Sequence, residues 1–178
     1  SGSITRSQIW NGTETQILLA GDRDTNTQLG YGCDISGDYI IGGGPQDDEG
    51  GSAAGAAYIF YKSGTTWSQQ AKLTASDPNT NDQFGEFCEI SGDYAIVGNY
   101  QEDAGGTSAG AAYVYKRDGT TWTQQAKLTA SDAATNDYFG WGVSIDGDYA
   151  IVGARGEDTG GEGAGAAYIF KRSGASGS

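Results

Sequence analysis

Histidine and methionine are both absent from this chain of 178 residues. Without histidine, the commonest general base is missing, and so are Ser-His and Cys-His nucleophile pairs and histidine-based zinc sites. Cationic side chains are also few: 10 Lys and Arg stand against 23 Asp and Glu, which gives a formal net charge of −13. This charge argues against nucleic-acid binding, because phosphates would be repelled, and it favours solubility and the attraction of cations.

Long apolar runs are absent as well. No stretch approaches the roughly 20 residues of a membrane span, so no membrane insertion is expected. The sequence shows no signal peptide and no methionine, from which we expect an internal or processed segment of a protein. Its ends, residues 1–3 and 174–178, are rich in Gly and Ser and are interpreted as linkers.

The chain does contain a regular repeat. Phe84-Gly85 and Phe139-Gly140 lie 140 − 85 = 55 residues apart, and Leu29-Gly30 lies the same distance before the first of them. The tripeptide Gly-Asp-Tyr and the tetrapeptide Gly-Ala-Ala-Tyr recur at this interval. A fixed period of this length indicates one supersecondary unit copied in tandem.

Each unit is predicted to contain four short strands. In the second copy, β-branched and aromatic residues gather at 84–90, 94–97, 111–115 and 122–129, and turn-forming residues occupy the intervals. No window carries a helical apolar stripe, and the 31 glycines would penalise a long helix. The fold class is therefore all-β. Four-stranded units of roughly 40 to 50 residues are typical of β-propeller blades, which bury their faces against neighbouring copies.

The order of motifs within one period resembles the FG-GAP repeats of bacteria and archaea, which are related to the propeller of integrin α-subunits. The resemblance extends over nearly the whole chain. It implies a β-propeller with three repeats of 55 residues in this chain, and it implies an extracellular or cell-surface location, since members of that family are mostly secreted or displayed. The matching elements are Phe84-Gly85, then 91–98, 110–115 and 122–132, which leads into the next Phe-Gly.

Blade boundaries follow from the Phe-Gly motifs. The third unit holds three strands before the chain ends, and 16–22 aligns with 71–77, the fourth strand of the first unit. We therefore expect the N-terminal strand to complete the last blade. Because known single-chain propellers have about four to eight blades, either the chain is a piece of a longer protein or copies close a ring together, and we expect a homodimer of six blades. The blades are 29–83, 84–138 and 139–173, after an N-terminal outer strand and loop at 4–28.

Two cysteines occupy equivalent positions in adjacent units. Cys33 and Cys88 are 55 residues apart, and the third unit has Val143 at that position. Valine there indicates a site for a modest apolar group, so we expect buried free thiols. A disulfide remains the alternative, although it needs Cα atoms within about 7 Å, which is less than the usual separation of stacked sheets.

Pairs of acidic residues are the remaining candidates for catalysis. They recur in every unit, whereas an active site needs such a pair once. We therefore interpret them as solvated loop charges and expect no enzymatic activity. The pairs are Asp47 with Asp48, Glu102 with Asp103 and Glu157 with Asp158.

The acidic loop before each Phe-Gly motif is a candidate Ca²⁺ site, because alternating oxygen ligands in a tight loop suit this cation. The alternative is that Asp and Asn side chains cap turns through their own backbone. The third loop has Ala134 within the alternation and is the poorer candidate. The candidate ligands are Asp77, Asn79, Asn81 and Asp82 in the second loop and Asp22, Asp24 and Asn26 in the first.

Two functions are compatible with this architecture. The first is a noncatalytic extracellular propeller module for adhesion or protein assembly, closing its ring by self-association. The second is a carbohydrate-binding or small-ligand-binding propeller, in which Trp67, Trp122 and Trp141 stack on sugar rings. Trp67 and Trp122 share a repeat position after a Gly-Thr-Thr turn, which also suits packing on an outer strand. An extracellular protein or a glycan is accordingly the expected partner besides a second copy of the chain.

Overall fold

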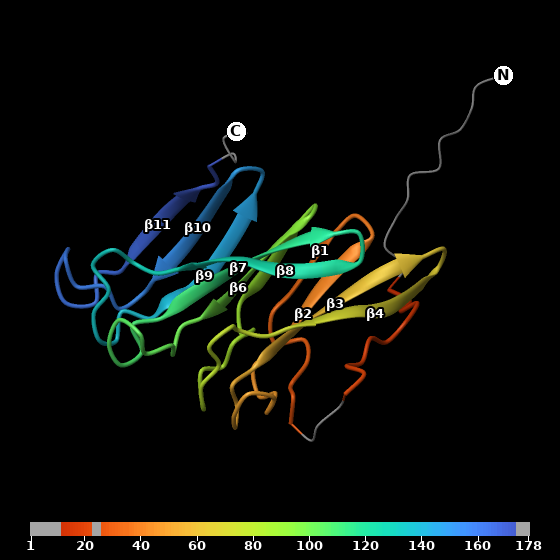
Figure 1. The fold of residues 1–178 in the computed structure, drawn as a ribbon, viewed down its shortest axis with the longest axis horizontal. Coiled ribbons are helices and arrows are strands. Elements are labelled where there is room, and N and C mark those ends of the chain that lie inside the picture. Colours follow the sequence, from red (N-terminus) through yellow and green to blue (C-terminus); the bar gives the residue numbers. More distant parts are fainter. Residues whose placement is uncertain (1–11, 23–25, 174–178) are drawn as a thin grey trace.

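The computed structural model describes residues 12–22 and 26–173, and every regular element in them is a β-strand. The strands form three antiparallel sheets that stand side by side (Figure 1). The first sheet contains β1 (Cys33–Ser36), β2 (Tyr39–Gly44), β3 (Ala56–Ser63) and β4 (Thr66–Leu73). The second contains β5 (Cys88–Ser91), β6 (Tyr94–Asn99), β7 (Ala111–Asp118) and β8 (Thr121–Leu128). The third contains β9 (Phe139–Asp146), β10 (Tyr149–Ala154) and β11 (Ala166–Lys171).

The sequence pattern explains the hairpins inside each sheet. Strands β5 and β6 are joined at Gly92, whose φ of 57° lies in the left-handed region that glycine adopts without steric cost. Strands β7 and β8 are joined in the same way at Gly119, with a φ of 61°. The all-β prediction and the four strands of the repeat unit are confirmed. The first strand of the second unit, however, begins at Cys88 and not at Phe84.

Small residues set the distance between neighbouring sheets. A Cβ atom on Gly43 of β2 would lie 1.6 Å from the carbonyl oxygen of Gly85, and one on Gly98 of β6 would lie 2.2 Å from that of Gly140. These pairs are equivalent, one period apart. The backbones of adjacent sheets therefore approach so closely that alanine cannot replace either glycine without displacing a sheet.

Two apolar cores fill the spaces between sheets. Ile41 and Ile59 of the first sheet pack against Ile90 and Val97 of the second, with Phe84 in the same cluster. The second core repeats this arrangement one period later between the second and third sheets, around Ile96, Phe139, Ile145 and Val152. Each sheet thus buries one face against its neighbour, as expected for blades of a stacked array.

The N-terminal segment 12–22 lies beside β4, at the end of the array opposite to β11 (Figure 1). Gln16 exchanges two hydrogen bonds with the backbone of Trp67, at 2.7 and 2.9 Å. Within the described residues the third sheet has three strands, and its outer strand β11 has no fourth strand beside it. The ring is therefore not closed within the described part of this chain, and completion of the last blade by the N-terminal strand stays a prediction.

The cysteines are both free thiols. Cys88 is buried, which confirms the expectation for this residue. Burial, together with the nearby Cys33 and Asp34, raises the pKa of the Cys88 thiol to about 12. Cys33 is exposed, so the expectation of burial is wrong there, because β1 belongs to the first sheet and no sheet precedes it in the described residues. Two further predictions, the linkers at 1–3 and 174–178, lie outside the described residues.

Candidate functional site

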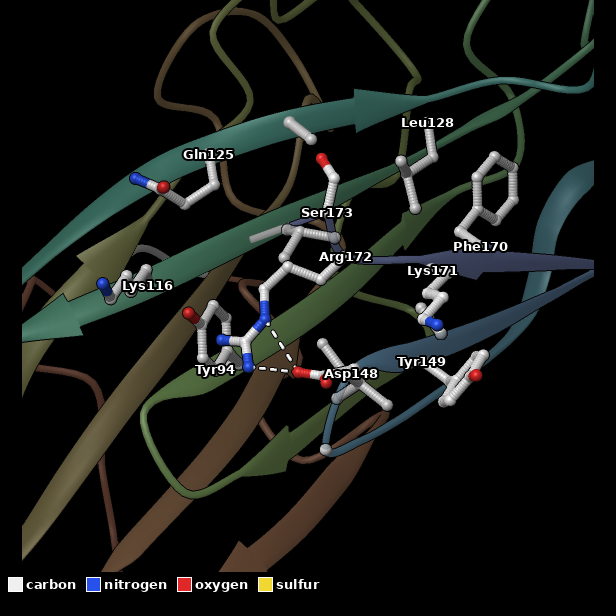
Figure 2. A pocket seen from close by; sticks show the side chains of 15 residues that line it. Tyr94, Lys116, Gln125, Leu128, Asp148, Tyr149, Phe170, Lys171, Arg172 and Ser173 are labelled. Atoms are coloured by element: carbon white, nitrogen blue, oxygen red, sulfur yellow. Dashed lines mark hydrogen bonds and ion pairs between the residues drawn. The ribbon is translucent and has the colours of Figure 1, made fainter. Parts of the chain in front are cut away.

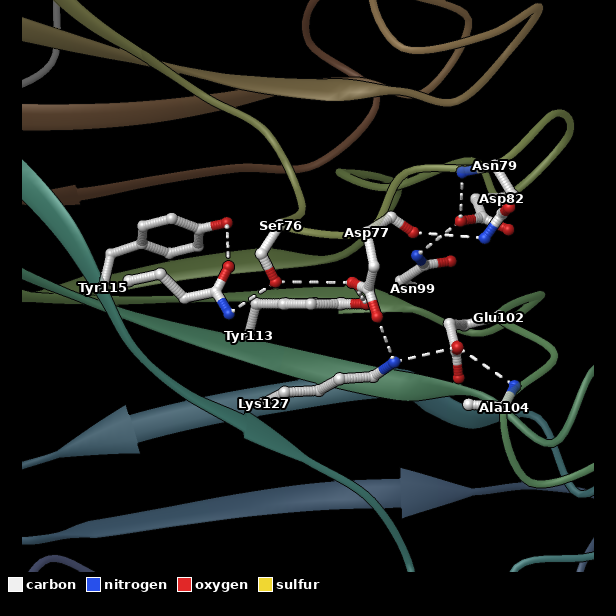
Figure 3. A network of polar contacts seen from close by, with 11 residues as sticks. Ser76, Asp77, Asn79, Asp82, Asn99, Glu102, Ala104, Tyr113, Tyr115 and Lys127 are labelled. Atoms are coloured by element: carbon white, nitrogen blue, oxygen red, sulfur yellow. Dashed lines mark hydrogen bonds and ion pairs between the residues drawn. The ribbon is translucent and has the colours of Figure 1, made fainter.

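A lysine from the fourth strand of the second sheet lies between two carboxylates, and we call this arrangement the lysine socket (Figure 3). Lys127 Nζ lies 2.7 Å from Asp77 Oδ2 and 2.8 Å from Glu102 Oε1. The hydroxyl of Tyr113 donates a hydrogen bond of 2.7 Å to Asp77 Oδ1, and Lys127 Nζ lies 5.6 Å from the centre of the Tyr113 ring. The socket joins β7 and β8 to the loop that precedes the second sheet.

The first sheet has an equivalent socket around Lys72. Its Nζ lies 2.6 Å from Asp22 Oδ2, 2.9 Å from Asp47 Oδ1 and 2.7 Å from Glu49 Oε2. Asp22 belongs to the N-terminal segment, so this segment has the same relation to the first sheet as residues 67–77 have to the second. The N-terminal segment thus occupies the position of the outer strand of a preceding blade.

The protonation equilibria of the socket follow from its contacts. Burial opposes ionisation of Asp77, but hydrogen bonds from Lys127 and Tyr113 outweigh it and hold the pKa of this carboxyl below its usual range. Burial and the bond to Asp77 raise the pKa of the Tyr113 hydroxyl far above its ordinary value. Burial disfavours the charged form of Lys127, yet its two carboxylate partners raise its pKa overall. The pair Lys127–Asp77 is therefore ionised at neutral pH.

The third sheet carries the same acidic groups without a lysine. The hydroxyl of Tyr168 donates to Asp132 Oδ1 at 2.7 Å, as Tyr113 does to Asp77. Glu157 occupies the position of Glu102 and is 7% exposed. The lysine would come from a fourth strand, which the third sheet lacks in the described residues, and no ion pair to Glu157 is found within them.

These sockets correct the prediction made for the paired carboxylates. The first member of each pair is buried: Asp47, Glu102 and Glu157 are 0%, 3% and 7% exposed, so the interpretation as solvated charges is wrong for them. They are buried because the lysine socket and backbone N–H groups accommodate them. The second members are exposed and accept hydrogen bonds from backbone N–H groups five residues further on. These residues are Asp48, Asp103 and Asp158.

A groove lies where a fourth strand of the third sheet would run, between β8 and β11 (Figure 2). Its cavity volume is about 740 Å³. Arg172 forms one wall: its guanidinium lies 4.5 Å from the centre of the Tyr94 ring and is paired with Asp148. Gln125 and Phe170 contribute to the lining. The groove therefore combines aromatic surface, a cation and an amide.

The candidate Ca²⁺ ligands are largely engaged with other groups of the protein. Asp77 belongs to the lysine socket, and Asp82 Oδ2 accepts hydrogen bonds from the backbone N–H of Asn79 at 2.9 Å and from the side chain of Asn99 at 3.3 Å (Figure 3). Burial raises the pKa of Asp82. Asn81 adopts a φ of 66°, as a turn requires. These contacts favour the turn-capping interpretation.

The first candidate loop is described in part. Asp22 lies in the socket of Lys72. Asn26 has a φ of 97°, and Asp24 lies outside the described residues. No group of three or more acidic or cysteine side chains placed to hold a metal ion occurs among residues 12–22 and 26–173. Ca²⁺ binding stays a prediction.

The candidate tryptophans do not converge on one site. Trp122 lies between the first two sheets, with its ring centre 6.2 Å from that of Tyr39 and its Nε1 donating to Gln70 Oε1 at 3.1 Å. Trp67 occupies the equivalent place at the end of the array and packs into the cluster of Tyr58 and Phe60. Both positions serve packing in this structure.

Trp141, in contrast, belongs to an aromatic cluster between the second and third sheets. Its ring centre lies 4.6 Å from that of Tyr100 and 5.5 Å from that of Phe87. The guanidinium of Arg155 lies 3.7 Å from the centre of the Trp141 ring and covers it. Burial and the charge of nearby Glu86 raise the pKa of Tyr100 to about 12.

The chain belongs to the FG-GAP repeat family. The family model matches three consecutive stretches, residues 12–60, 67–115 and 122–170, which together span most of the sequence. Each matched stretch begins at a fourth strand, or at its N-terminal counterpart, and ends on the third strand of the next sheet. The recognition of the repeat from its motifs is thereby confirmed. No curated protein matches the chain as a whole.

The lysine sockets and the groove were missed by reasoning from the sequence. The signal was present: Lys72 and Lys127, and likewise Asp22, Asp77 and Asp132, are separated by the repeat period. It was not recognised because a lysine and its carboxylates are 25 and 50 residues apart. Only the stacking of sheets brings them together.

No helix in the described residues has the length and apolar character required to cross a membrane.

Proposed function

We propose that this chain is a noncatalytic propeller module for adhesion or protein assembly, in which two copies associate head to tail and close a six-bladed ring. The observation that supports this proposal is that the two ends of the array carry complementary uncovered faces. Known single-chain propellers have about four to eight blades, so two chains of three reach a closed number whereas three chains would exceed it.

The last sheet exposes apolar residues that its predecessors bury. Ile41 and Ile96 are both 0% exposed because the following sheet covers them, whereas the equivalent Ile151 of β10 is 44% exposed. Ile169 of β11 is 72% exposed, and its equivalent in the first sheet, Ile59, is fully buried. The repeat period therefore predicts that a following sheet fits this face.

The first sheet exposes the complementary face. Ile90 and Ile145 are 3% and 9% exposed because the preceding sheet covers them, but the equivalent Ile35 of β1 is 60% exposed. Ile151 of one copy and Ile35 of another would meet as Ile41 and Ile90 meet within the chain. A head-to-tail contact of this kind buries both faces, and a second identical contact closes a ring of two copies.

Donation of the N-terminal strand is part of the same proposal. The apolar residues Ile17 and Leu19 of this segment are 67% and 53% exposed beside β4. In the ring, the segment would run along β11 of the partner copy and pair its open edge, which would otherwise be a site for aggregation. The contacts of Gln16 and Asp22 with the first sheet would be kept, because β11 of the partner lies on the far side of the segment.

The solution mass tests this proposal. Light scattering at micromolar concentration should give twice the chain mass of 18.4 kDa, and deletion of residues 1–22 should abolish the dimer. A stable, well-folded monomer would refute the ring.

Glycine substitutions provide a matched series for the same test. In Gly98→Ala the new Cβ meets the Gly140 carbonyl at 2.2 Å, so the fold itself should be severely destabilised. In the equivalent Gly153→Ala the nearest atom of the same chain is 3.8 Å away, so the chain should fold. In a closed ring, however, a partner backbone would approach Gly153, and Gly153→Ala should give a folded monomer. A Gly153→Ala variant that dimerises like the wild type would contradict the head-to-tail contact.

The absence of catalysis and the extracellular location belong to this proposal as well. The location rests on the family resemblance. The absence of catalysis is supported by the lysine sockets, since the buried carboxylates Asp47 and Glu102 pair with lysines in successive sheets as structural elements do. A screen with glycosides, esters and phosphoesters should detect no turnover, and turnover that disappears in Glu102→Gln would refute this part.

A second candidate function is binding of a glycan or another small ligand, and the Trp141 cluster favours it. Trp141, Tyr100 and Phe87 form a continuous aromatic surface with Arg155 at its edge. A glycan array compared between the wild type and Trp141→Ala would distinguish this function. Specific binding that the substitution removes supports it, and silence of the array together with dimer formation supports assembly.

A further inference from the structure

The groove between β8 and β11 repeats the walls of a site that is filled elsewhere in the chain. One period earlier, Tyr39 and Gln70 receive the indole of Trp122, with ring centres 6.2 Å apart and a hydrogen bond of 3.1 Å. Their equivalents Tyr94 and Gln125 line the groove (Figure 2). The groove therefore offers an aromatic ring and an amide in the arrangement that holds an indole at the preceding sheet.

The cation beside this site is conserved between the two sheets of the same chain. Arg117 lies 4.3 Å from the centre of the Tyr39 ring and pairs with Asp93, as Arg172 stacks on Tyr94 and pairs with Asp148. In the β7–β8 ladder, Arg117 is the partner of Trp122. A strand that pairs with β11 in the same register would thus place its tryptophan opposite Arg172.

The lysine socket of the third sheet fixes a second position on the same strand. In the β7–β8 ladder, Lys127 is the partner of Tyr113. The equivalent position on β11 is Tyr168, whose hydroxyl is bonded to Asp132 and which lies near buried Glu157. A cation placed there would meet two carboxylates and an aromatic face, as Lys127 does. Charge complementarity therefore requires a lysine at this register.

We propose that the open edge of β11 recognises an extended peptide strand that carries Trp and Lys 127 − 122 = 5 residues apart, with the indole in the groove and the ammonium in the socket of Asp132, Glu157 and Tyr168. This inference rests on the proposed completion of the third sheet by a donated strand, and it names what that strand must carry. The ladder supplies main-chain hydrogen bonds, and the two side-chain sites supply specificity.

The N-terminal segment meets only the main-chain requirement. One period before Trp67 the chain has Gly12, and one period before Lys72 it has Ile17. A strand like residues 122–127 should therefore bind the edge more tightly than the segment 12–22 does. The two strands compete for one edge, so such a peptide should also displace the N-terminal strand of a partner copy.

Anisotropy of labelled peptides tests the inference with the full chain. The probe is a synthetic peptide of residues 119–132, and its variants replace the tryptophan by alanine or the lysine by glutamine. Each replacement should weaken binding about tenfold or more, because buried aromatic and charged anchors dominate strand recognition. A peptide of residues 9–22 should bind more weakly than the probe. Equal binding of all four peptides, absence of binding, or preference for the 9–22 peptide would each overturn the proposal.

Substitutions in the protein assign each anchor to its site. Gln125→Ala, at an exposed position, should weaken the probe but leave the peptide without tryptophan unaffected. Glu157→Gln should weaken the probe but leave the peptide without lysine unaffected, and its melting temperature shows whether it folds. Lack of this pairwise pattern in both variants would refute the assigned register.

The mass of the chain without peptide keeps this test separate from that of the proposed function. If the chain is monomeric and binds the probe selectively, the ring is refuted and the recognition site stands. If the chain dimerises and the dimer is indifferent to the probe at saturating concentration, the recognition site is refuted and the ring stands.

Discussion

Lys127 brings together a carboxylate from the loop before the second sheet and one from the β6–β7 loop. Its side chain is 22% exposed and that of Glu102 only 4%, so the pair is mostly shielded from water. Taking charges out of water is costly, and a buried pair is tolerated because its partners compensate each other. The removal of one partner should consequently cost more than the pair contributes as a whole.

We predict that Lys127→Gln lowers the free energy of unfolding by roughly 3 kcal/mol, because it leaves Glu102 buried without its cation. Urea denaturation measures this loss. Lys116→Gln on the neighbouring strand changes an exposed lysine and should shift the stability by less than about 0.5 kcal/mol. Equal losses in the two variants would show that the socket has no special role.

Asp77 should make the stability dependent on pH. Its pKa is lowered in the folded chain, so the unfolded chain binds the proton more readily, and ionised Asp77 stabilises the fold above the ordinary aspartate pKa of about 3.9. This contribution is lost as the pH falls through the lower pKa of the folded state. We expect Asp77→Asn to be less stable than the wild type at pH 7, and the difference to shrink below about pH 4.

Denaturation at pH 7, 5, 4 and 3 measures this effect. The exposed Asp118 provides the control, because Asp118→Asn should follow the pH profile of the wild type. A constant difference between Asp77→Asn and the wild type across this range would contradict the assigned shift.

At the scale of elements, the fourth strand of each sheet holds neighbouring sheets together. Trp122 of β8 packs on Tyr39 and bonds to Gln70, both of the first sheet, so β8 acts beyond its own ladder. The tryptophans were read from the sequence as packing residues or ligand platforms. Packing prevails for Trp67 and Trp122, since both join clusters with neighbouring aromatic residues.

We predict that Trp122→Ala costs roughly 2 kcal/mol, below the 3–5 kcal/mol of a fully buried tryptophan, because Trp122 is half-buried. Trp67→Ala should cost less, since Trp67 faces the N-terminal segment and no complete sheet. Thermal denaturation of the two variants measures the difference. A larger loss in Trp67→Ala would mean that the N-terminal segment covers its sheet as firmly as a full blade.

Element boundaries show how far local pattern was sufficient. The hairpins at Gly92 and Gly119 were predictable, because glycine punctuates alternating apolar residues there. The beginning of β5 was not, because Phe84 and Gly85 have strand-like composition but meet the backbone of the preceding sheet: Phe84 forms an isolated parallel bridge with Gly55. Contact with another sheet therefore overrides the local preference for a regular ladder at this point.

At the scale of the whole molecule, Ca²⁺ offers a test of the loops between sheets. We predict that any rise of the melting temperature in millimolar Ca²⁺, compared with chelator, arises from loop 77–82 and not from loop 132–137. Asn79 of the former is replaced by Ala134 in the latter, which removes one oxygen. Asn79→Ala makes the two loops alike at this position and should abolish the rise. An unchanged melting temperature of the wild type in Ca²⁺ would remove the hypothesis.

The sequence by itself determined the repeat, the all-β class and the family, because strand alternation, turn glycines and a fixed period are local properties that each copy carries. It did not reveal the lysine sockets, the close approach of Gly43 to Gly85 or the groove beside β11. These depend on contacts between residues of different sheets, and the distances that decide them arise from the stacking of whole sheets. The burial of Glu102, which local composition assigned to solvent, has the same cause: only the tertiary structure places Lys127 against it.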